Sequence, residues 1–298
     1  MSNLCVNWSR KGSWRYKIDD FSGLDPIQGL AIDCYFIAAL SSLAWTCPSR
    51  LKNPNSAGSI SARFYADPNK PLSFATVTAT VNDNLPVDDP ATCNLQCAKS
   101  NTQDEIWPGI YEKMFASYLG IPCCGGVAGQ PDICNQMPDG NPLFTLFNLT
   151  GWQQVPILTS AFSDGNAIFT EVNKLVAGNK VKYPTVAWTK HGFQVSGSAV
   201  VPDHSYSVLG TYSLPGANYI VLRNPCGTIT RCPDIAMIDT GSWTYTDTMY
   251  VQGAIPGSLP PGMGTWPTLT RSFDLSIGLF ALEANEFRNY FEGYGYVT

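Results

Sequence analysis

The first half of the chain contains two segments whose apolar patterns predict helices. Residues 34–45 are apolar on every side apart from two serines, which is typical of a helix buried in the centre of a protein. Residues 104–119 are amphipathic instead, because large apolar side chains recur every three to four positions. Pro108 is tolerated only near the first turn of that helix, and Gly120 with Pro122 ends it. We therefore expect one fully buried helix and one helix with a single buried face.

Short runs rich in β-branched and aromatic residues predict strands, most of them in the second half. These runs are residues 74–81, 185–188, 203–209 and 219–222. A last helix is expected over residues 285–291, with three aromatic side chains facing inward: Phe287, Tyr290 and Phe291. Residues 120–142 and 253–267 are rich in turn-forming residues and are expected to be long loops.

The order of these elements predicts an α+β protein in two parts. Residues 1–150 are expected to form a helix-rich subdomain and residues 151–298 a β-rich subdomain. The character of the sequence changes near Gly151, which marks the expected boundary.

The net charge and the lengths of the apolar runs limit the kinds of partner and the location that we expect for this protein. The 298 residues carry a net charge of −5, which argues against nucleic acid or an anionic membrane as a main partner. The longest apolar run, residues 35–45, is too short to cross a bilayer. Residues 1–8 lack the apolar core of a signal peptide. A cytoplasmic protein with no transmembrane segment is expected, and secretion is the alternative left open.

The ten cysteines do not form a regular framework. Three close pairs are compatible with disulfides or with a metal: Cys93/Cys97, Cys123/Cys124 and Cys226/Cys232. A zinc site needs four ligands, normally as two regularly spaced pairs, and the chain has only two histidines. Zinc is therefore not expected.

Cys34 stands at the first turn of the central helix, and Asp33 is the residue expected to cap that helix. The positive end of the helix dipole favours the thiolate and lowers the thiol pKa. Gln28 lies six residues earlier on a loop, so its side-chain amide can approach the Cys34 backbone N–H. Two donors aimed at one point form an oxyanion hole beside a nucleophile. The alternative is a buried structural cysteine, which is common on apolar helices.

His204 and Asn224 supply the groups that a nucleophilic thiol needs. If their two strands form a hairpin that turns near residue 214, these side chains face each other about 4.5–5.5 Å apart at Cβ. The asparagine amide then fixes the tautomer of the imidazole, which acts as the base. The alternative for a histidine in a strand is a structural role. His191 has no orienting partner in the sequence and is expected on the surface.

Several motifs in collinear order resemble the protease core of the calpains, a branch of the papain-like cysteine peptidases. Residues 28–40 resemble Q-G-x-L-G-D-C-W-F-L-A-A-L, and residues 105–120 resemble the E-F-W…E-K-A-Y-A helix. Residues 204–208 resemble H-A-Y-S-V, and residues 222–227 resemble I-R-N-P-W-G. Residues 150–151 are similar to the T-G-G motif, and residues 287–291 to the closing F-x-x-F helix.

The resemblance implies a two-lobed papain-like fold with the active-site cleft between a helical lobe and a β-rich lobe. It implies that Cys34 is the nucleophile, His204 the general base and then acid, and Asn224 the orienting residue. Gln28 would complete the oxyanion hole. The implied activity is hydrolysis of a protein or peptide substrate through an acyl-enzyme, and Gly151 and Asp203 are implied to lie beside the substrate.

Two departures from the family pattern fall at this site. Cys226 replaces a tryptophan that covers the contact between histidine and asparagine, so a wetter hydrogen bond is expected. Asp203 replaces a glycine, so its side chain is expected to crowd the substrate or to raise the pKa of His204.

A third departure concerns calcium, which the family binds in acidic loops. Residues 227–231 contain no acid, and hard cations need several oxygen ligands. No cofactor is therefore expected. Asp20 and Asp25, upstream of the cysteine, are the weak candidates for a calcium site.

Two further functions remain as alternatives to an active endopeptidase. The departures at Cys226 and Asp203 fit an inactive relative that holds an extended peptide without cutting it. The same thiol site could also transfer the acyl group to an amine instead of water.

Overall fold

The structure is a computed structural model that describes residues 7–52, 60–66, 76–123, 127–178, 180–193, 200–214, 216–227, 250–252 and 278–298. The helices are α1 (Cys34–Thr46), η1 (Pro48–Arg50), α2 (Trp107–Tyr118), α3 (Ile133–Gln136), α4 (Pro142–Thr150), η3 (Thr159–Ala161), α5 (Gly165–Lys174) and α6 (Ala284–Tyr290). The short strands of the first half are β1 (Asn7–Ser9), β2 (Pro26–Ile27), β3 (Ile60–Tyr65), β4 (Thr76–Val81), β5 (Leu85–Val87) and β6 (Lys99–Ser100).

The second half is built on one nine-stranded sheet. Its main path runs β13-β14-β12-β11-β10-β15-β7, and β9 joins it beside β11 and carries β8. These strands are β7 (Gln154–Leu158), β8 (Val176–Ala177), β9 (Lys180–Val181), β10 (Thr185–Thr189), β11 (Ser205–Leu214), β12 (Ala217–Arg223), β13 (Tyr250–Gln252), β14 (Leu279–Glu283) and β15 (Phe291–Val297). All pairings are antiparallel except β13 with β14. The expected α+β class is confirmed.

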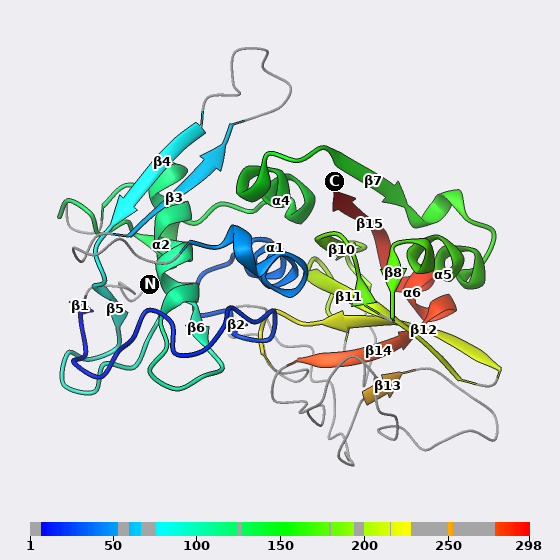
Figure 1. The fold of residues 1–298 in the computed structure, drawn as a ribbon, viewed down its shortest axis with the longest axis horizontal. Helices are drawn as coiled ribbons and strands as arrows, with labels where there is room; N and C mark the ends of the chain where they lie inside the picture. Colours follow the sequence, from blue (N-terminus) through cyan, green and yellow to red (C-terminus); the bar gives the residue numbers. More distant parts are fainter. Residues whose placement is uncertain are drawn as a thin grey trace.

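Helix α1 lies between the helical side of the molecule and this sheet (Figure 1). The Ser42 hydroxyl accepts from the Thr185 N–H at 2.7 Å and donates to the Thr185 carbonyl at 2.8 Å, which ties the helix to β10. Ser207 of β11 donates to the Ala38 carbonyl at 2.7 Å. The few polar groups of this buried helix thus make its bonds to the sheet, as buried polar groups must be hydrogen-bonded.

Two hydrophobic cores flank the helix. The first packs α1 against α2 and the β3–β4 hairpin, with the rings of Phe36 and Phe115 stacked 4.5 Å apart and Phe64 beside them. The second lies between the large sheet and helices α5 and α6, where Phe287 stacks on Phe291 at 4.3 Å. The cores do not divide cleanly at Gly151, because Val297 belongs to the first of them. The domain boundary at residue 150 stays a prediction.

The helix predictions are confirmed at α1, at α2 with Pro108 in its first turn, and at α6. Phe291 is buried as expected, but it begins β15 instead of ending the helix. The expected loop over residues 120–142 is wrong in part, because α3 falls inside it and buries Ile133. Residues 253–267, also expected to be a loop, lie outside the described residues.

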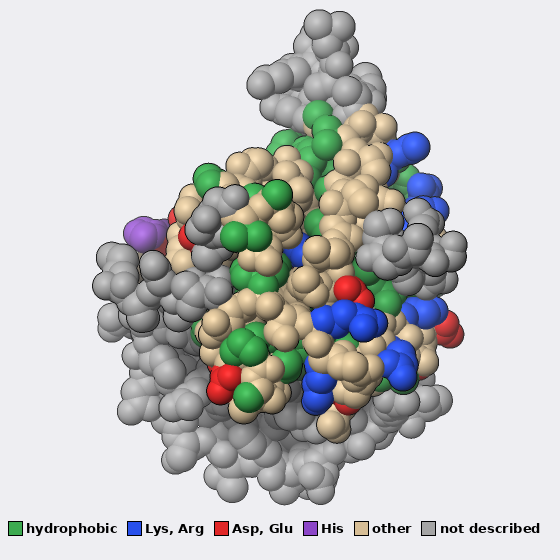
Figure 2. Space-filling model, turned by 90° about the vertical axis from the view of Figure 1, so that its left-hand side faces the viewer, with side chains coloured by type: hydrophobic (Ala, Val, Ile, Leu, Met, Phe, Trp, Pro, Cys, Tyr) green, Lys and Arg blue, Asp and Glu red, His purple; other side chains and the backbone are tan. Residues whose placement is uncertain are grey.

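Across the described part of the chain, no helix has the length and apolar character needed to cross a membrane. Figure 2 shows the face on the side of β1, where Lys and Arg side chains gather mainly on the right of the view. Hydrophobic side chains lie mainly on the left of that face and along its upper edge.

Replacing Phe36 by alanine tests the first core. Phe36 is fully buried and stacked on Phe115, so Phe36→Ala should lower the free energy of unfolding by about 3–5 kcal/mol. Leu158→Ala is the control, since this side chain is 52% exposed on β7 and its loss should change the value by less than about 0.5 kcal/mol. Urea unfolding measures both, and equal effects would contradict the assigned core.

Candidate functional site

Cys34 is the first residue of α1, half-buried at the end where the helix dipole is positive. Asp33 occupies the N-cap position, as expected, but its side chain makes no capping hydrogen bond. The Cys34 sulfur is hydrogen-bonded by the backbone and the hydroxyl of Ser205, the residue that follows His204. The structure therefore brings the start of α1 against the start of β11. Ser205 is a contact that the sequence analysis did not identify.

The expected low pKa of the thiol is wrong for this arrangement. Burial raises the pKa of Cys34 to about 11, and the negative charge of Asp33 raises it further, while the bonds from Ser205 act in the opposite direction. Desolvation of the thiolate thus outweighs the helix dipole. At neutral pH the sulfur is a thiol.

His204 and Asn224 form a buried hydrogen-bonded pair. His204 Nε2 lies 2.9 Å from Asn224 Oδ1, and the same oxygen accepts from the Cys226 N–H at 3.0 Å. Because an amide oxygen only accepts, Nε2 carries the proton, and Nδ1 is the nitrogen that can take one from a thiol. Thr189 fixes the histidine backbone, since its hydroxyl accepts from the His204 N–H at 2.9 Å.

The expected direct opposition of these two residues is wrong, although the hairpin is confirmed. The ladder between β11 and β12 ends at the pair Ser207 and Arg223, and a bulge lies between Val208 and Gly210. His204 therefore stands three residues before the last pair and Asn224 one residue after it. The side chains meet diagonally across the open end of the hairpin.

Burial also decides the charge of the imidazole. His204 is 2% exposed and Asn224 is 1% exposed. Burial lowers the pKa of His204 to about 4, and the bond to Asn224 offsets this in part by favouring the protonated ring. The edge of the His204 ring meets the Tyr206 ring at a centroid distance of 5.0 Å. At neutral pH the base is uncharged.

Cys226 stands where the family has a tryptophan. It is disulfide-bonded, and its sulfur lies 3.8 Å from His204 Nε2 and 3.6 Å from Gln28 Oε1. The expected wetter hydrogen bond is wrong, because the pair of His204 and Asn224 is almost fully buried. Cys134 is also disulfide-bonded, whereas Cys93, Cys97 and Cys123 are free.

Gln28 is buried and links the loop before Cys34 to the residues that follow β12. Its backbone N–H donates to the Pro225 carbonyl at 2.8 Å, next to Asn224 in the chain. Its side-chain Nε2 donates to the Ala31 carbonyl at 2.7 Å. The amide carries two hydrogens, so one remains for an oxyanion. The loop that precedes Cys34 is thereby held against the residues that follow β12.

Asp203 pairs with His191 at the surface, and its place beside a substrate stays a prediction. Its carboxylate lies 2.6 Å from His191 Nδ1, and the two side chains are 56% and 91% exposed. His191 is on the surface as expected, but it has an acidic partner. The expected rise in the pKa of His204 is wrong, because that pKa is lowered by burial. Asp203 has a φ of 51°, a left-handed conformation that favours glycine, which explains why the family has glycine there.

Gly151 lies towards the other end of α1. It ends α4 with a φ of 71°, and a side chain there would meet the Tyr65 ring at 2.6 Å. Thr150 lines a cavity of about 390 Å³ together with Leu43. Leu43 is nine residues from Cys34, about 14 Å along a helix axis. A role for Gly151 in substrate binding stays a prediction.

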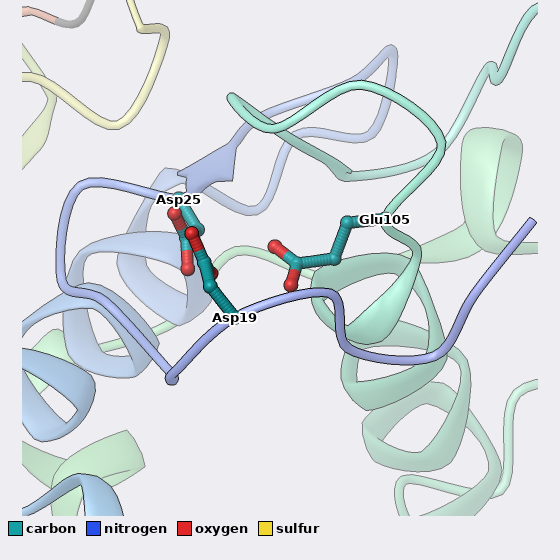
Figure 3. Close-up of side chains that lie close together, drawn as sticks. All are labelled: Asp19, Asp25 and Glu105. Carbon is teal, nitrogen blue, oxygen red and sulfur yellow. The ribbon is translucent and has the colours of Figure 1, made fainter.

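Three carboxylates close together are the described group that could hold a cation. Asp19, Asp25 and Glu105 offer oxygens that all lie within 4.8 Å of one another (Figure 3). Burial raises the pKa of Asp25 to about 7, and the charges of Glu105 and Asp19 raise it too, so a bound cation would favour its ionised form. Asp20 is not in this group, since it is fully exposed beside Lys17.

Oxygen ligands of this kind suit calcium, so the cluster fits the cation that the family resemblance implies. Asp25 was a candidate from the sequence, whereas Asp19 and Glu105 were not. In the sequence, Glu105 is marked only as the first residue of the stretch that resembles the E-F-W…E-K-A-Y-A helix. Residues 228–231, in the loop where calcium is not expected, lie outside the described residues.

Titration of His204 tests the electrostatics of the site. The chain has two histidines, so NMR of a His191→Gln variant reports His204 alone. We expect a pKa of about 4, and a lower pKa in Asn224→Ala, because the lost bond favoured the protonated ring. Asn218→Ala, at a half-buried position near the far end of β12, should leave the midpoint unchanged. A midpoint near the ordinary value of about 6.5 would contradict the buried, desolvated imidazole.

The chain is similar to known cysteine proteases at the level of the family. Residues 2–232 match the family described as calpain family cysteine protease. Calpain-13 of Rattus norvegicus is 27% identical over 239 residues, which cover 74% of this chain and 32% of that protein. A thiol protease of Porphyromonas gingivalis (strain ATCC BAA-308 / W83) is 24% identical over 219 residues, covering 67% of this chain and 43% of that protein.

The matched region spans less than half the length of either relative. The family match, in contrast, extends over most of the chain and contains Cys34, His204 and Asn224. The chain belongs to the calpain family of cysteine proteases.

Proposed function

We propose that this chain is a cysteine endopeptidase in which Cys34, His204 and Asn224 form the catalytic centre. The observation that carries the proposal is the buried hydrogen bond between His204 Nε2 and Asn224 Oδ1. His204 directly precedes Ser205, and Ser205 contacts the Cys34 sulfur. A thiol, a base beside it and a group that orients the base are what nucleophilic catalysis requires. The proposal includes a substrate cleft between the part that carries α1 and the β-rich part.

The reaction follows from the tautomer. The Cys34 sulfur attacks the carbonyl carbon of the scissile bond while His204 Nδ1 takes the thiol proton. The Cys34 N–H and the remaining Gln28 amide hydrogen stabilise the oxyanion. His204 then gives its proton to the leaving amine, and a thioester remains on Cys34. Water, deprotonated by the same nitrogen, then attacks the thioester carbonyl; the C–S bond breaks, the acid leaves, and the Cys34 sulfur takes the proton back from His204.

Formation of a thiolate on Cys34 and an imidazolium on His204 is opposed by the burial of both groups. With the pKa of Cys34 raised to about 11 and that of His204 lowered to about 4, the neutral pair is favoured over the ion pair. The sulfur, bonded to Ser205 here, would have to turn towards Nδ1. A cation held by Asp19, Asp25 and Glu105 would supply a fixed link between the loop before Gln28 and the start of α2.

The proposed substrate class is a protein or peptide, as the family implies. The activities and partners of the full-length relatives are proposals for this chain, because the matched region covers only 32% and 43% of their lengths. The disulfide bonds of Cys134 and Cys226 support secretion over the expected cytoplasmic location, since disulfides are rare in the cytosol.

An inactive peptide-binding module is the second candidate. The neutral thiol and neutral imidazole favour it, because neither group is in the charged form of an assembled pair. Acyl transfer to an amine uses the same residues, and the masses of the products distinguish it from hydrolysis.

Cleavage of a fluorogenic peptide library by single variants tests the proposal. Cys34→Ala should abolish turnover, and Gln28→Ala should lower kcat by about 10²–10³, because one oxyanion donor is lost. Cys47→Ala is the matched control, since Cys47 is a free, half-buried cysteine at the other end of α1. Cleavage that persists in Cys34→Ala would refute the assignment. Peptide binding by an uncleaving wild type would favour the binding module.

A further inference from the structure

Two carboxyl groups meet in the core directly behind the first turn of α1. Asp33 precedes Cys34, and Glu112 lies on α2; both residues are fully buried. Their side chains are hydrogen-bonded to each other. Two ionised carboxylates cannot make such a bond because both only accept, so one of them carries a proton. The pair therefore holds one proton and one negative charge.

The second bond of Glu112 fixes the pair in the protein. Its Oε2 accepts from the Ala98 backbone N–H at 2.9 Å. The same stretch of chain holds the loop before Cys34, since the Leu30 N–H donates to the Gln96 carbonyl at 2.8 Å. Gly29 packs so closely here that a side chain would meet the Cys97 backbone at 2.4 Å. One segment thus supports both the Gln28 loop and the carboxyl pair.

The other titratable groups around the pair do not take up the proton that Asp33 and Glu112 share. Burial raises the pKa of Tyr35, on α1, and that of Cys97, so both are neutral at neutral pH. Lys113 follows Glu112 on α2, but its ammonium donates to Asn82 and to the Asn84 carbonyl. The Cys34 thiol is also neutral. Glu112 is thus hydrogen-bonded by the Ala98 N–H and by the Cys97 thiol as well as by Asp33.

The pair acts on the residue next to it. The Asp33 carbonyl accepts from the N–H groups of Phe36 and Ile37 at 2.8 and 3.1 Å and so begins α1. The Asp33 side chain makes no capping hydrogen bond to the helix. It is hydrogen-bonded to Glu112 instead. Moving Asp33 would move the backbone of Cys34.

We propose that Asp33 and Glu112 are positioning residues that share one proton, and that this shared proton holds the first turn of α1, with Cys34, against residues 96–98. The part of the inference that concerns Cys34 reactivity rests on the proposed peptidase function; the shared proton does not.

The sign of the pH effect follows from the folded and unfolded states. Burial raises the pKa of Glu112 to about 7 in the fold, whereas an unfolded glutamate has a pKa of about 4.3. The folded protein therefore binds one more proton between these values. Its stability falls as pH rises from about 4.3 to about 7, and the full loss is present above that range. At higher pH two negative charges repel each other behind Cys34.

Glu112→Gln is the informative substitution. The glutamine amide can donate to Asp33 and its oxygen can accept from the Ala98 N–H, so the bonds and the single negative charge remain without a titrating proton. Glu112→Leu removes the bonds. Glu171→Gln is the control, because Glu171 is a partly exposed glutamate on α5 that pairs with Lys174.

Three measurements on the full chain test the inference. Difference infrared spectra should show a protonated carboxyl band that Glu112→Gln loses and Glu171→Gln keeps. Urea unfolding across pH should show a decline in wild-type stability between about pH 5 and 7 that Glu112→Gln flattens. The ratio of Cys34 alkylation rates, Glu112→Gln over wild type, should be about one near pH 5 and rise towards pH 8. Glu112→Leu should change the alkylation rate of Cys34 at every pH, because the bonds of Glu112 to Asp33 and to the Ala98 N–H are lost.

A protonated band that survives in Glu112→Gln, or the same pH dependence of stability in both proteins, would overturn the shared proton. An alkylation ratio that does not change with pH would overturn the positioning role even if the proton is found. If Cys34 is unreactive in every protein while the band and the stability slope behave as expected, the peptidase function fails and the shared proton stands.

Discussion

The burial of α1 on every side is the constraint on which the rest of the structure depends. A helix with no polar face can only lie inside the protein, so the β3–β4 hairpin and α2 must cover one side and the large sheet the other. Its few polar groups then have to bond to neighbouring elements, as Ser42 does to β10 and Trp45 does to the Leu209 carbonyl. The same requirement places Cys34, at the end of this helix, against the start of β11.

This burial has an electrostatic consequence for the site. The surroundings that exclude water from His204 and Asn224 also disfavour charge on the imidazole and on the thiol. Carboxyl groups nearby respond in the same way: burial raises the pKa of Asp25 and of Glu112. A site built from neutral groups is well shielded. Under the proposed function, an additional event such as cation binding would have to stabilise a thiolate beside an imidazolium.

Local patterns in the sequence identified much of this arrangement. The apolar run at residues 34–45 and the amphipathic stretch at 104–119 predicted α1 and α2, because helix periodicity depends on neighbours in the chain. The hairpin of β11 and β12, which begins just after His204 and ends just before Asn224, was also predicted. The predicted direct opposition of His204 and Asn224 was wrong, because a β-bulge shifts the register and no local pattern reveals it.

Contacts between distant segments could not be predicted. The pairing of Asp203 with His191, the bond from Ser205 to Cys34 and the cluster of Asp19, Asp25 and Glu105 all depend on tertiary packing. The charge of a group depends on packing as well. A helix start suggested a low thiol pKa for Cys34, but the depth of burial reverses that sign.

Reaction with a peptidyl epoxide, read by intact mass and peptide mapping, tests the central claim most directly. The chain is labelled at about pH 6.5 with calcium and again with a chelator, beside a His204→Ala variant. The account predicts a single adduct on Cys34 that forms faster with calcium and is lost without His204. It is contradicted if Cys34 reacts no faster than the free, half-buried Cys47 in either condition.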